Sequence, residues 1–343
     1  MVAQDSRESS GAIPAFLSID VEPNGFQLAR SESSNWSGYD AIVEWTEGFR
    51  LELGKLSRST PNFGWYFRTD PQIAEVYGRP DHALTAFPDH TSHLRRRGDY
   101  FGVHCHPIRW CNERRSWIHD FADADWNAEC TKFALDAFAR WNDGPTKRFR
   151  SGAGFLTEEI VGILDQHGVE IDISLEPVKA WPASFSEVPS GIDSSPYTGV
   201  HTGCLDAPRI AYRPSLRDFR IAAKRYARTL TIVPLTTYDF APWQPRWRNL
   251  IDAMMQKPKQ RDVRVLHLSE EWPNAEFYWD LVSRRLSTMR VPYLSLAVRT
   301  DAPGSLPITR SQQLLDALLR HPLVERLDFG DPSRTAPALV GRN

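Results

Sequence analysis

The feature that most constrains the fold of this chain is a repeated alternation of short apolar runs with longer segments of helical period. Eight runs have the length and residue content of buried strands: 15–20, 62–68, 100–106, 148–152, 170–174, 231–236, 263–268 and 293–299. Helical patterns lie between most of them, at about 39–57, 125–141, 157–167, 275–289 and 310–320. Strands that alternate with helices form parallel crossovers, so this order predicts an α/β protein.

The number of predicted strands favours a closed or nearly closed barrel, with an open doubly wound sheet as the alternative. Residues 175–225 interrupt the alternation, because they contain six prolines, many Ser and Gly, and little periodicity. We expect them to form a long insertion on one face of a single domain that spans residues 13–330. Residues 1–12 and a tail over residues 331–343 are expected to be loose.

Charge and chain-end composition limit the partners to be expected. Lys and Arg number 41 and Asp and Glu 43, and this net charge of −2 argues against non-specific binding to nucleic acid. No run approaches the roughly 18 apolar residues of a membrane span, and the first residues lack the pattern of a secretory signal. The four cysteines form no C-x-x-C pair. We therefore expect a cytoplasmic protein with reduced thiols.

Two predicted strands end in side chains that are able to bind a metal ion. Asp20 and Glu22 close the first apolar run, and residues at i and i+2 of a strand share a face. His104 and His106 have the same spacing at the end of the third run. On parallel strands all four lie on one rim, where two histidines and a carboxylate form a ligand set of catalytic zinc. The simpler readings are an acidic pair that faces water and two half-buried histidines bonded to the backbone.

A third segment, 149–155, leaves a predicted strand and enters a predicted helix. Its Arg150 is able to pair with a carboxylate through two hydrogen bonds and fix its orientation. Gly152 and Gly154 permit a tight turn or the close approach of a ligand. The dinucleotide-binding pattern G-x-G-x-x-G is incomplete here. The alternative is a surface arginine beside an ordinary turn.

These three segments, in this order, resemble motifs of the polysaccharide deacetylase family, the NodB homology domain of carbohydrate esterase family 4. Residues 16–23 stand where that family has its T-F-D-D-G-P strand, and 102–107 stand where it has its metal-binding histidines. Residues 149–155, with the helix and strand that follow, are similar to its R-x-P-x-G motif. Residues 211–215 and 232–236 resemble a branch found with lipopolysaccharide and exopolysaccharide biosynthesis proteins. The resemblance covers roughly residues 13–300.

The resemblance implies a distorted (β/α)7-type barrel and the metal-dependent removal of an acetyl group from a sugar or polysaccharide. The first Asp of the family motif, the catalytic base, matches Asp20, but its metal-binding second Asp falls on Val21. Either Glu22 takes the ligand role, or Asp20 is the ligand and Glu22 the base. His104 and His106 complete a site for a divalent ion, zinc. The base-orienting arginine matches Arg150, and the motif's Pro is replaced by Gly152.

The general acid of the family is a histidine near a late strand, for which His267 is the candidate and the strand end 298–301 competes. Trp110 and Trp117 follow the histidine strand, and we expect one of them, with Gly154, to contact substrate. His119 is expected to be solvated in a polar loop.

The sequence is also consistent with two other functions. One is a non-catalytic barrel that binds a glycan or partner protein, which the departures from the family motifs suggest. The other is a glycosidase that uses Asp20 and Glu22 as its carboxylate pair.

Overall fold

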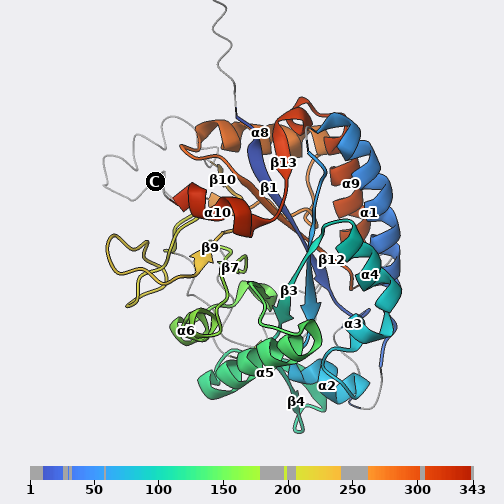
Figure 1. The fold of residues 1–343 in the computed structure, drawn as a ribbon, viewed down its shortest axis with the longest axis vertical. Coiled ribbons are helices and arrows are strands. Elements are labelled where there is room, and N and C mark those ends of the chain that lie inside the picture. Colours follow the sequence, from blue (N-terminus) through green and yellow to red (C-terminus); the bar gives the residue numbers. More distant parts are fainter. Residues whose placement is uncertain are drawn as a thin grey trace, which may run out of the picture.

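The computed structural model describes residues 11–25, 30, 33–57, 59–177, 197–198, 206–240, 262–301 and 306–340 (Figure 1). Its largest sheet contains β1 (Ile13–Val21), β2 (Gly64–Arg68), β3 (Tyr100–Cys105), β6 (Arg148–Ser151), β7 (Ile171–Asp172), β9 (Thr231–Ile232) and β12 (Leu294–Arg299). They pair in the order β12-β1-β2-β3-β6-β7-β9, and every pair is parallel. Beyond β9, the Thr236 N–H donates to the Ser295 carbonyl at 3.0 Å, which brings the last strand of this order to the first. The predicted distorted barrel of parallel strands is confirmed.

Alternate side chains of the strands pack on opposite faces of this sheet. Leu17 and Ile19 belong to the larger apolar cluster, which includes residues of the surrounding helices. Phe16 lies on the other face, in a second cluster with Tyr66 and Ile171 from neighbouring strands. Asp20 and Glu22 continue the face of Phe16, so the first strand carries its two carboxylates toward the inner side of the curled sheet.

The helices surround the sheet, and the five predicted ones are present: α1 (Ser37–Leu56), α5 (Ala124–Asn142), α6 (Glu158–Gln166), α8 (Ala275–Thr288) and α9 (Leu306–Leu318) (Figure 1). The Thr157 hydroxyl caps α6 by accepting the Ile160 N–H at 3.1 Å, and Gly168 follows that helix at a φ of 72°. Three short helices lie between β2 and β3: α2 (Pro71–Tyr77), α3 (His82–Ala86) and α4 (Pro88–Arg96). Each is too short for a helical period to stand out in the sequence.

The strand predicted at 263–268 does not belong to the large sheet. Instead, β11 (Asp262–Val265) pairs antiparallel with β10 (Thr237–Phe240) in a two-stranded sheet. Its alternation of polar and apolar residues suits a strand with one exposed face, whereas strands of a parallel barrel are buried on both. The additional parallel partner of β1 is β13 (Leu327–Phe329), at the end of the predicted domain.

The tail expected at 331–343 also differs from the prediction. Helix α10 (Pro332–Val340) packs beside β1 and β7, with Ala336 and Leu339 buried in the apolar cluster of the inner face. The short 3-10 helix η3 (Pro322–Arg326) precedes it. These apolar side chains hold residues 332–340 against the barrel.

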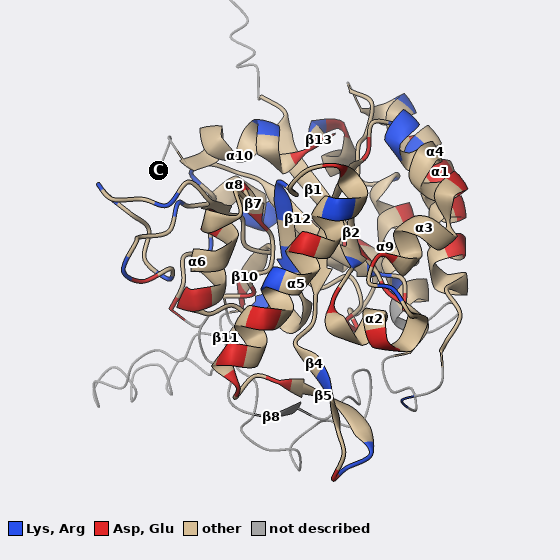
Figure 2. Ribbon diagram, turned by 60° about the horizontal axis from the view of Figure 1, so that its bottom comes forward, with Lys and Arg blue, Asp and Glu red and all other residues tan. Residues whose placement is uncertain are grey.

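A second small sheet follows the histidine strand. It consists of β4 (Ile108–Cys111), β5 (Ser116–Asp120) and β8 (Tyr197–Thr198), and its β4–β5 hairpin extends from the body of the barrel (Figure 2). Of the insertion predicted at 175–225, residues 178–196 and 199–205 lie outside the described residues, so its extent stays a prediction. Within the described part of the chain, no helix is both long enough and apolar enough to cross a membrane.

Candidate metal centre

The end of β1 is fixed by hydrogen bonds to the segment that follows β12. The Glu22 N–H donates to the Thr300 hydroxyl at 2.8 Å, and that hydroxyl donates to the Glu22 carbonyl at 3.0 Å. The Thr300 N–H donates to the Asp20 carbonyl at 3.0 Å. Thr300 therefore continues the pairing of these two strands past their ends, and it fixes the backbone that carries both carboxylates.

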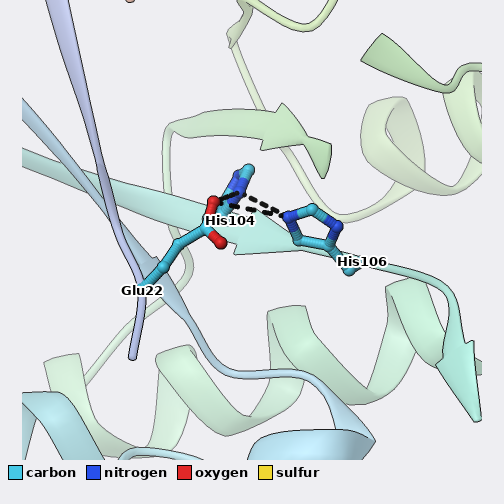
Figure 3. A group of neighbouring side chains, drawn as sticks. All are labelled: Glu22, His104 and His106. Atoms are coloured by element: carbon cyan, nitrogen blue, oxygen red, sulfur yellow. Dashed lines mark hydrogen bonds and ion pairs between the residues drawn. The ribbon is translucent and has the colours of Figure 1, made fainter. Parts of the chain in front are cut away.

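Glu22, His104 and His106 form one compact group at this end of the barrel (Figure 3). The Oε1 atom of Glu22 lies 3.0 Å from Nε2 of His104 and 3.5 Å from Nε2 of His106. The two Nε2 atoms are 2.9 Å apart. All three residues are 3% exposed or less, so this polar group is enclosed by protein.

The outer nitrogen of each imidazole has its own partner. Nδ1–H of His104 donates to the Arg150 carbonyl at 2.9 Å, so Nε2 is the ring nitrogen of His104 that faces Glu22. Nδ1 of His106 lies 2.8 Å from Nε2 of His119. Such outer partners set the orientation and tautomer of histidines that bind metals.

The donor atoms of the group suit a divalent cation. The Oε2 atom of Glu22 is buried and has no hydrogen-bond partner among the described residues, and a buried charged oxygen without a partner is costly. Burial alone raises the pKa of Glu22, but Arg299 and the two histidines outweigh burial and hold this pKa well below its usual value. Burial and Arg68 lower the pKa of His106. A neutral imidazole and an ionised carboxylate are the forms that bind zinc.

Asp20, two residues before Glu22, occupies a different environment. Nε–H of Arg150 donates to both its carboxylate oxygens, at 2.8 and 2.9 Å, and Nη1 of Arg150 donates to the Ile173 carbonyl at 2.7 Å. Oδ1 of Asp20 lies 3.9 Å from Nδ1 of His104, on the outer side of that ring. Burial alone lowers the pKa of Arg150, but the pairing with Asp20 outweighs it and raises this pKa. Asp20 is therefore paired with an arginine, whereas Glu22 faces the two histidines.

The glycines after Arg150 are explained by close contacts. A Cβ atom on Gly152, the first residue of the 3-10 helix η1 (Gly152–Gly154), would lie 2.3 Å from the ring atoms of His106. Gly154 has a φ of 67°, and a Cβ there would lie 3.1 Å from the Ser174 carbonyl oxygen and 3.2 Å from Cγ of Glu176. Gly152 thus leaves space for an imidazole, and Gly154 allows a left-handed turn.

The two candidates for a general acid lie on different segments. Nε2 of His267 is 3.4 Å from Oε2 of Glu176, and the side chain of His267 is 23% exposed. At the strand end 298–301, Nε of Arg299 is 3.8 Å from Oε1 of Glu22, and Nη2 donates to Asp301 at 2.7 Å. Arg299 belongs to the strand end that the sequence offers as the competing segment, but its position beside Glu22 was not predicted.

The expectation for His119 is wrong. It is 3% exposed, because β5 turns back along β4, the strand that follows the histidines, and places this ring against His106. Glu176 was also missed, since it follows a predicted strand without any motif. The hairpin that brings His119 back joins residues that are 13 positions apart, which no local pattern in the sequence indicates.

The two tryptophans expected at the substrate groove have different environments. Trp117 is 1% exposed and packs edge-on against Trp110, with ring centroids 5.5 Å apart, so it belongs to a small apolar cluster. Trp110 is partly exposed, and the Arg30 guanidinium lies 5.9 Å from its ring centroid. Trp110 is therefore the tryptophan of this pair that remains a candidate for contact with substrate.

No family model matches the chain, and a search of curated proteins finds no match. Solved structures with a similar fold include a protein from Mycobacterium smegmatis described as a polysaccharide deacetylase, with a TM-score of 0.49 and 10% identity over 98% of this chain and 93% of that one. PuuE allantoinase has a TM-score of 0.49 and 8% identity, over 96% of this chain and 91% of its own. A family 4 carbohydrate esterase from Streptomyces lividans has a TM-score of 0.38 and 9% identity, over 94% and 95%.

These likenesses concern the fold alone. Membership of the branch associated with lipopolysaccharide and exopolysaccharide biosynthesis stays a prediction.

Proposed function

We propose that this protein is a metal-dependent hydrolase that removes an acetyl group from a sugar or polysaccharide. The observation that carries the proposal is the enclosed group of Glu22, His104 and His106, with a buried carboxylate oxygen that lacks a hydrogen-bond partner among the described residues. Two histidines and one carboxylate are a known ligand set of catalytic zinc, which keeps a further position open. We infer that these three residues hold a divalent ion, zinc. A zinc ion supplies a lowered pKa for water and polarisation of a carbonyl group.

Asp20 is the proposed general base. Arg150 donates to both of its oxygens, so the carboxylate is fixed in one orientation, and it is excluded from bulk water at 2% exposure. This assigns the ligand role to Glu22 and the base role to Asp20, one of the two arrangements that the sequence left open. Arg150 acts as the residue that orients the base.

His267 is the proposed general acid. Nε2 of His267 lies 3.4 Å from Oε2 of Glu176, and this partly exposed ring would give a proton to a leaving amine or alcohol. Glu176 orients this ring and does not itself contact the reacting atoms in the proposal. Trp110, on the partly exposed hairpin, and Gly154 are the proposed contacts to the sugar.

The experiment measures acetate released from N-acetylated and O-acetylated oligosaccharides by the zinc-loaded protein. Wild type is expected to release acetate, and Asp20→Asn is expected to lower kcat by about 10²–10⁴-fold, because a general base contributes that much. His104→Ala is expected to lose both metal and activity. His90→Ala is the matched control, since His90 is partly exposed and pairs with Asp40 away from this group. Absence of acetate release from every acetylated glycan, by wild type with bound zinc, would refute the proposal.

A second candidate function is a non-catalytic barrel that binds a glycan. One observation favours it: the Arg299 guanidinium already lies near Glu22 and reduces the need for a metal cation there. Metal analysis separates the two, because only the enzyme requires a bound ion. The glycosidase alternative is not supported, since Asp20 and Glu22 lie on one strand and point to different partners.

A further inference from the structure

Residues 213–228, called here the basic loop, form an ordered projection on the side of the barrel beside α6 (Figure 2). The Phe219 side chain is buried in the main apolar cluster, and its N–H donates to Glu158 of α6 at 2.6 Å. The Arg228 N–H donates to the Pro214 carbonyl at 3.0 Å, which closes the base of the loop. Isolated bridges join Pro214 to Ala222 and Ser215 to Ala227. The backbone of the basic loop is therefore held in one shape.

This fixed backbone presents large apolar side chains to solvent. Leu216 is 53% exposed, Ile221 56% and Tyr226 78%. In the described part of the chain six large apolar side chains are exposed, and these three make up half of them within eleven consecutive residues. Single exposed apolar side chains need no explanation, but a group of them on one ordered loop marks a surface that binds something.

The same loop is strongly basic. It contains six Lys and Arg residues and one acidic residue, in a chain whose net charge is −2. Arg220 pairs with Asp218, and Arg228 pairs with Glu158. Among the described residues no ion-pair partner is found for the other four cations, which are Arg213, Arg217, Lys224 and Arg225. These cations are exposed, and along the loop they lie between and beside the exposed apolar residues.

We propose that the basic loop docks the protein on the surface of an anionic phospholipid bilayer. Aliphatic side chains such as Leu216 and Ile221 gain free energy when they leave water for the acyl boundary, and Tyr226 suits the headgroup level. The four cations complement anionic headgroups, each contributing roughly five-fold to binding near such a surface. A soluble polyanion would use the cations, but it would offer no hydrocarbon to Leu216 and Ile221. Charge and apolar exposure together therefore favour a bilayer.

The test is flotation of the full-length protein with vesicles. Vesicles of phosphatidylcholine with about 30% phosphatidylglycerol are compared with pure phosphatidylcholine vesicles. The protein is expected to float with the anionic vesicles only, and to be released as salt rises from about 0.1 to about 0.5 M. Arg217→Gln/Arg225→Gln is expected to weaken binding about 25-fold, from two charges of roughly five-fold each.

A second variant separates bilayer docking from simple charge attraction. Leu216→Ser/Ile221→Ser/Tyr226→Ser keeps every cation and is expected to weaken binding to anionic vesicles at least about ten-fold. Leu51→Ser/Phe277→Ser, which alters exposed apolar residues elsewhere, is the matched control and should bind like wild type. Circular dichroism and thermal unfolding show that each variant is folded.

Three results would overturn the inference. One is wild-type protein that does not float with anionic vesicles at low salt. Another is a serine variant that binds anionic vesicles as tightly as wild type, which indicates charge attraction alone. The third is equal binding of wild type to soluble polyglutamate and to anionic vesicles, which indicates a site for an acidic partner.

Discussion

Two buried carboxylates, Asp99 and Glu22, show how similar burial serves different purposes. Both side chains are at most 1% exposed. Asp99 precedes β3 and accepts hydrogen bonds from Nη1 and Nη2 of Arg50 at 2.9 and 2.6 Å, from the Phe63 N–H at 2.9 Å, and from the Trp65 indole at 2.8 Å. Glu22 is at the far end of its strand, with one oxygen near two histidines and the other without a hydrogen-bond partner among the described residues.

The difference indicates which carboxylate is structural and which is functional. Both carboxylate oxygens of Asp99 accept hydrogen bonds from donors of the chain itself. This buried charge therefore links α1, β2 and β3 without a bound ligand. One oxygen of Glu22 has no hydrogen-bond partner among the described residues and the other faces the Nε2 atoms of two imidazoles, a set of atoms that a cation would bind together. Incomplete pairing in a buried polar group is expected where a ligand completes it.

The largest expected effect is the loss of activity when Glu22 is replaced. Glu22→Gln removes one charged ligand, and we expect kcat for acetate release to fall at least about 10³-fold, about 4 kcal/mol in the activation barrier. The free energy of unfolding of the metal-free protein should stay within about 1 kcal/mol, because no donor loses its partner. Glu44→Gln, on the exposed face of α1, is the control. Full activity in Glu22→Gln would contradict the ligand role.

Asp99→Asn should produce the opposite pattern. The substitution removes the buried counter-charge of Arg50 and leaves only the partly exposed Glu47, at 3.3 Å, so the free energy of unfolding should fall by about 3–5 kcal/mol. Zinc affinity of the folded protein should remain within about two-fold, as Asp99 lies outside the metal group. Urea unfolding and zinc titration measure the two quantities, with the exposed Asp136→Asn as control. A variant as stable as wild type would show that the two carboxylates do not differ as described.

Asp172 is a third buried carboxylate, and it accepts hydrogen bonds only from the hydroxyl and N–H of Ser174 in the described part of the chain. Burial raises its pKa to about 7. Its folded pKa is above the unfolded value of about 3.9, so the folded state binds the extra proton and stability falls as pH rises between these values.

Asp172→Asn removes this dependence. Wild type should lose stability as the pH rises from 4 to 8, whereas this contribution is missing in the variant. The difference in free energy of unfolding, variant minus wild type, should therefore rise by about 2–4 kcal/mol between pH 4 and pH 8. Urea unfolding with a chelator present measures it, so that metal binding does not contribute. The same relative stability at both pH values would mean that Asp172 is ionised in the folded protein.

The smallest expected effect tests the geometry around Glu22. In Gly152→Ala the new methyl group collides with the His106 ring, so the ring must move and zinc affinity should fall about 10–100-fold. Gly48→Ala is the matched control, because a Cβ at Gly48 meets nothing within 4 Å. Isothermal titration with zinc gives both affinities. Unchanged affinity in Gly152→Ala would show that His106 is not held in this position.

The sequence predicts the periodic parts of the molecule well. The parallel strands and the five long helices carry a clear pattern of buried residues, and the i and i+2 spacing correctly places Glu22, His104 and His106 together. The short helices at 71–96 and the strand at 327–329 carry too few residues for a period to be read. The alternation of polar and apolar residues in β11 suits a strand with one exposed face, but it does not indicate that β10 is the antiparallel partner.

The contacts around the site were less accessible from sequence. Thr300, Arg299 and Glu22 are brought together across 278 positions of chain by the pairing of β1 with β12. Gly152 appears in the sequence as a departure from the family motif. The structure supplies a physical reason, since the His106 ring occupies the space that any larger side chain would need.

The measurement that tests the central claim most directly is zinc binding to the metal-free protein by isothermal titration calorimetry. We expect one zinc per chain in wild type and Asp20→Asn, and loss of this binding in Glu22→Gln, His104→Ala and His106→Ala. Wild type that binds no zinc, or a Glu22→Gln variant that binds it as tightly as wild type, would contradict a metal centre at Glu22, His104 and His106.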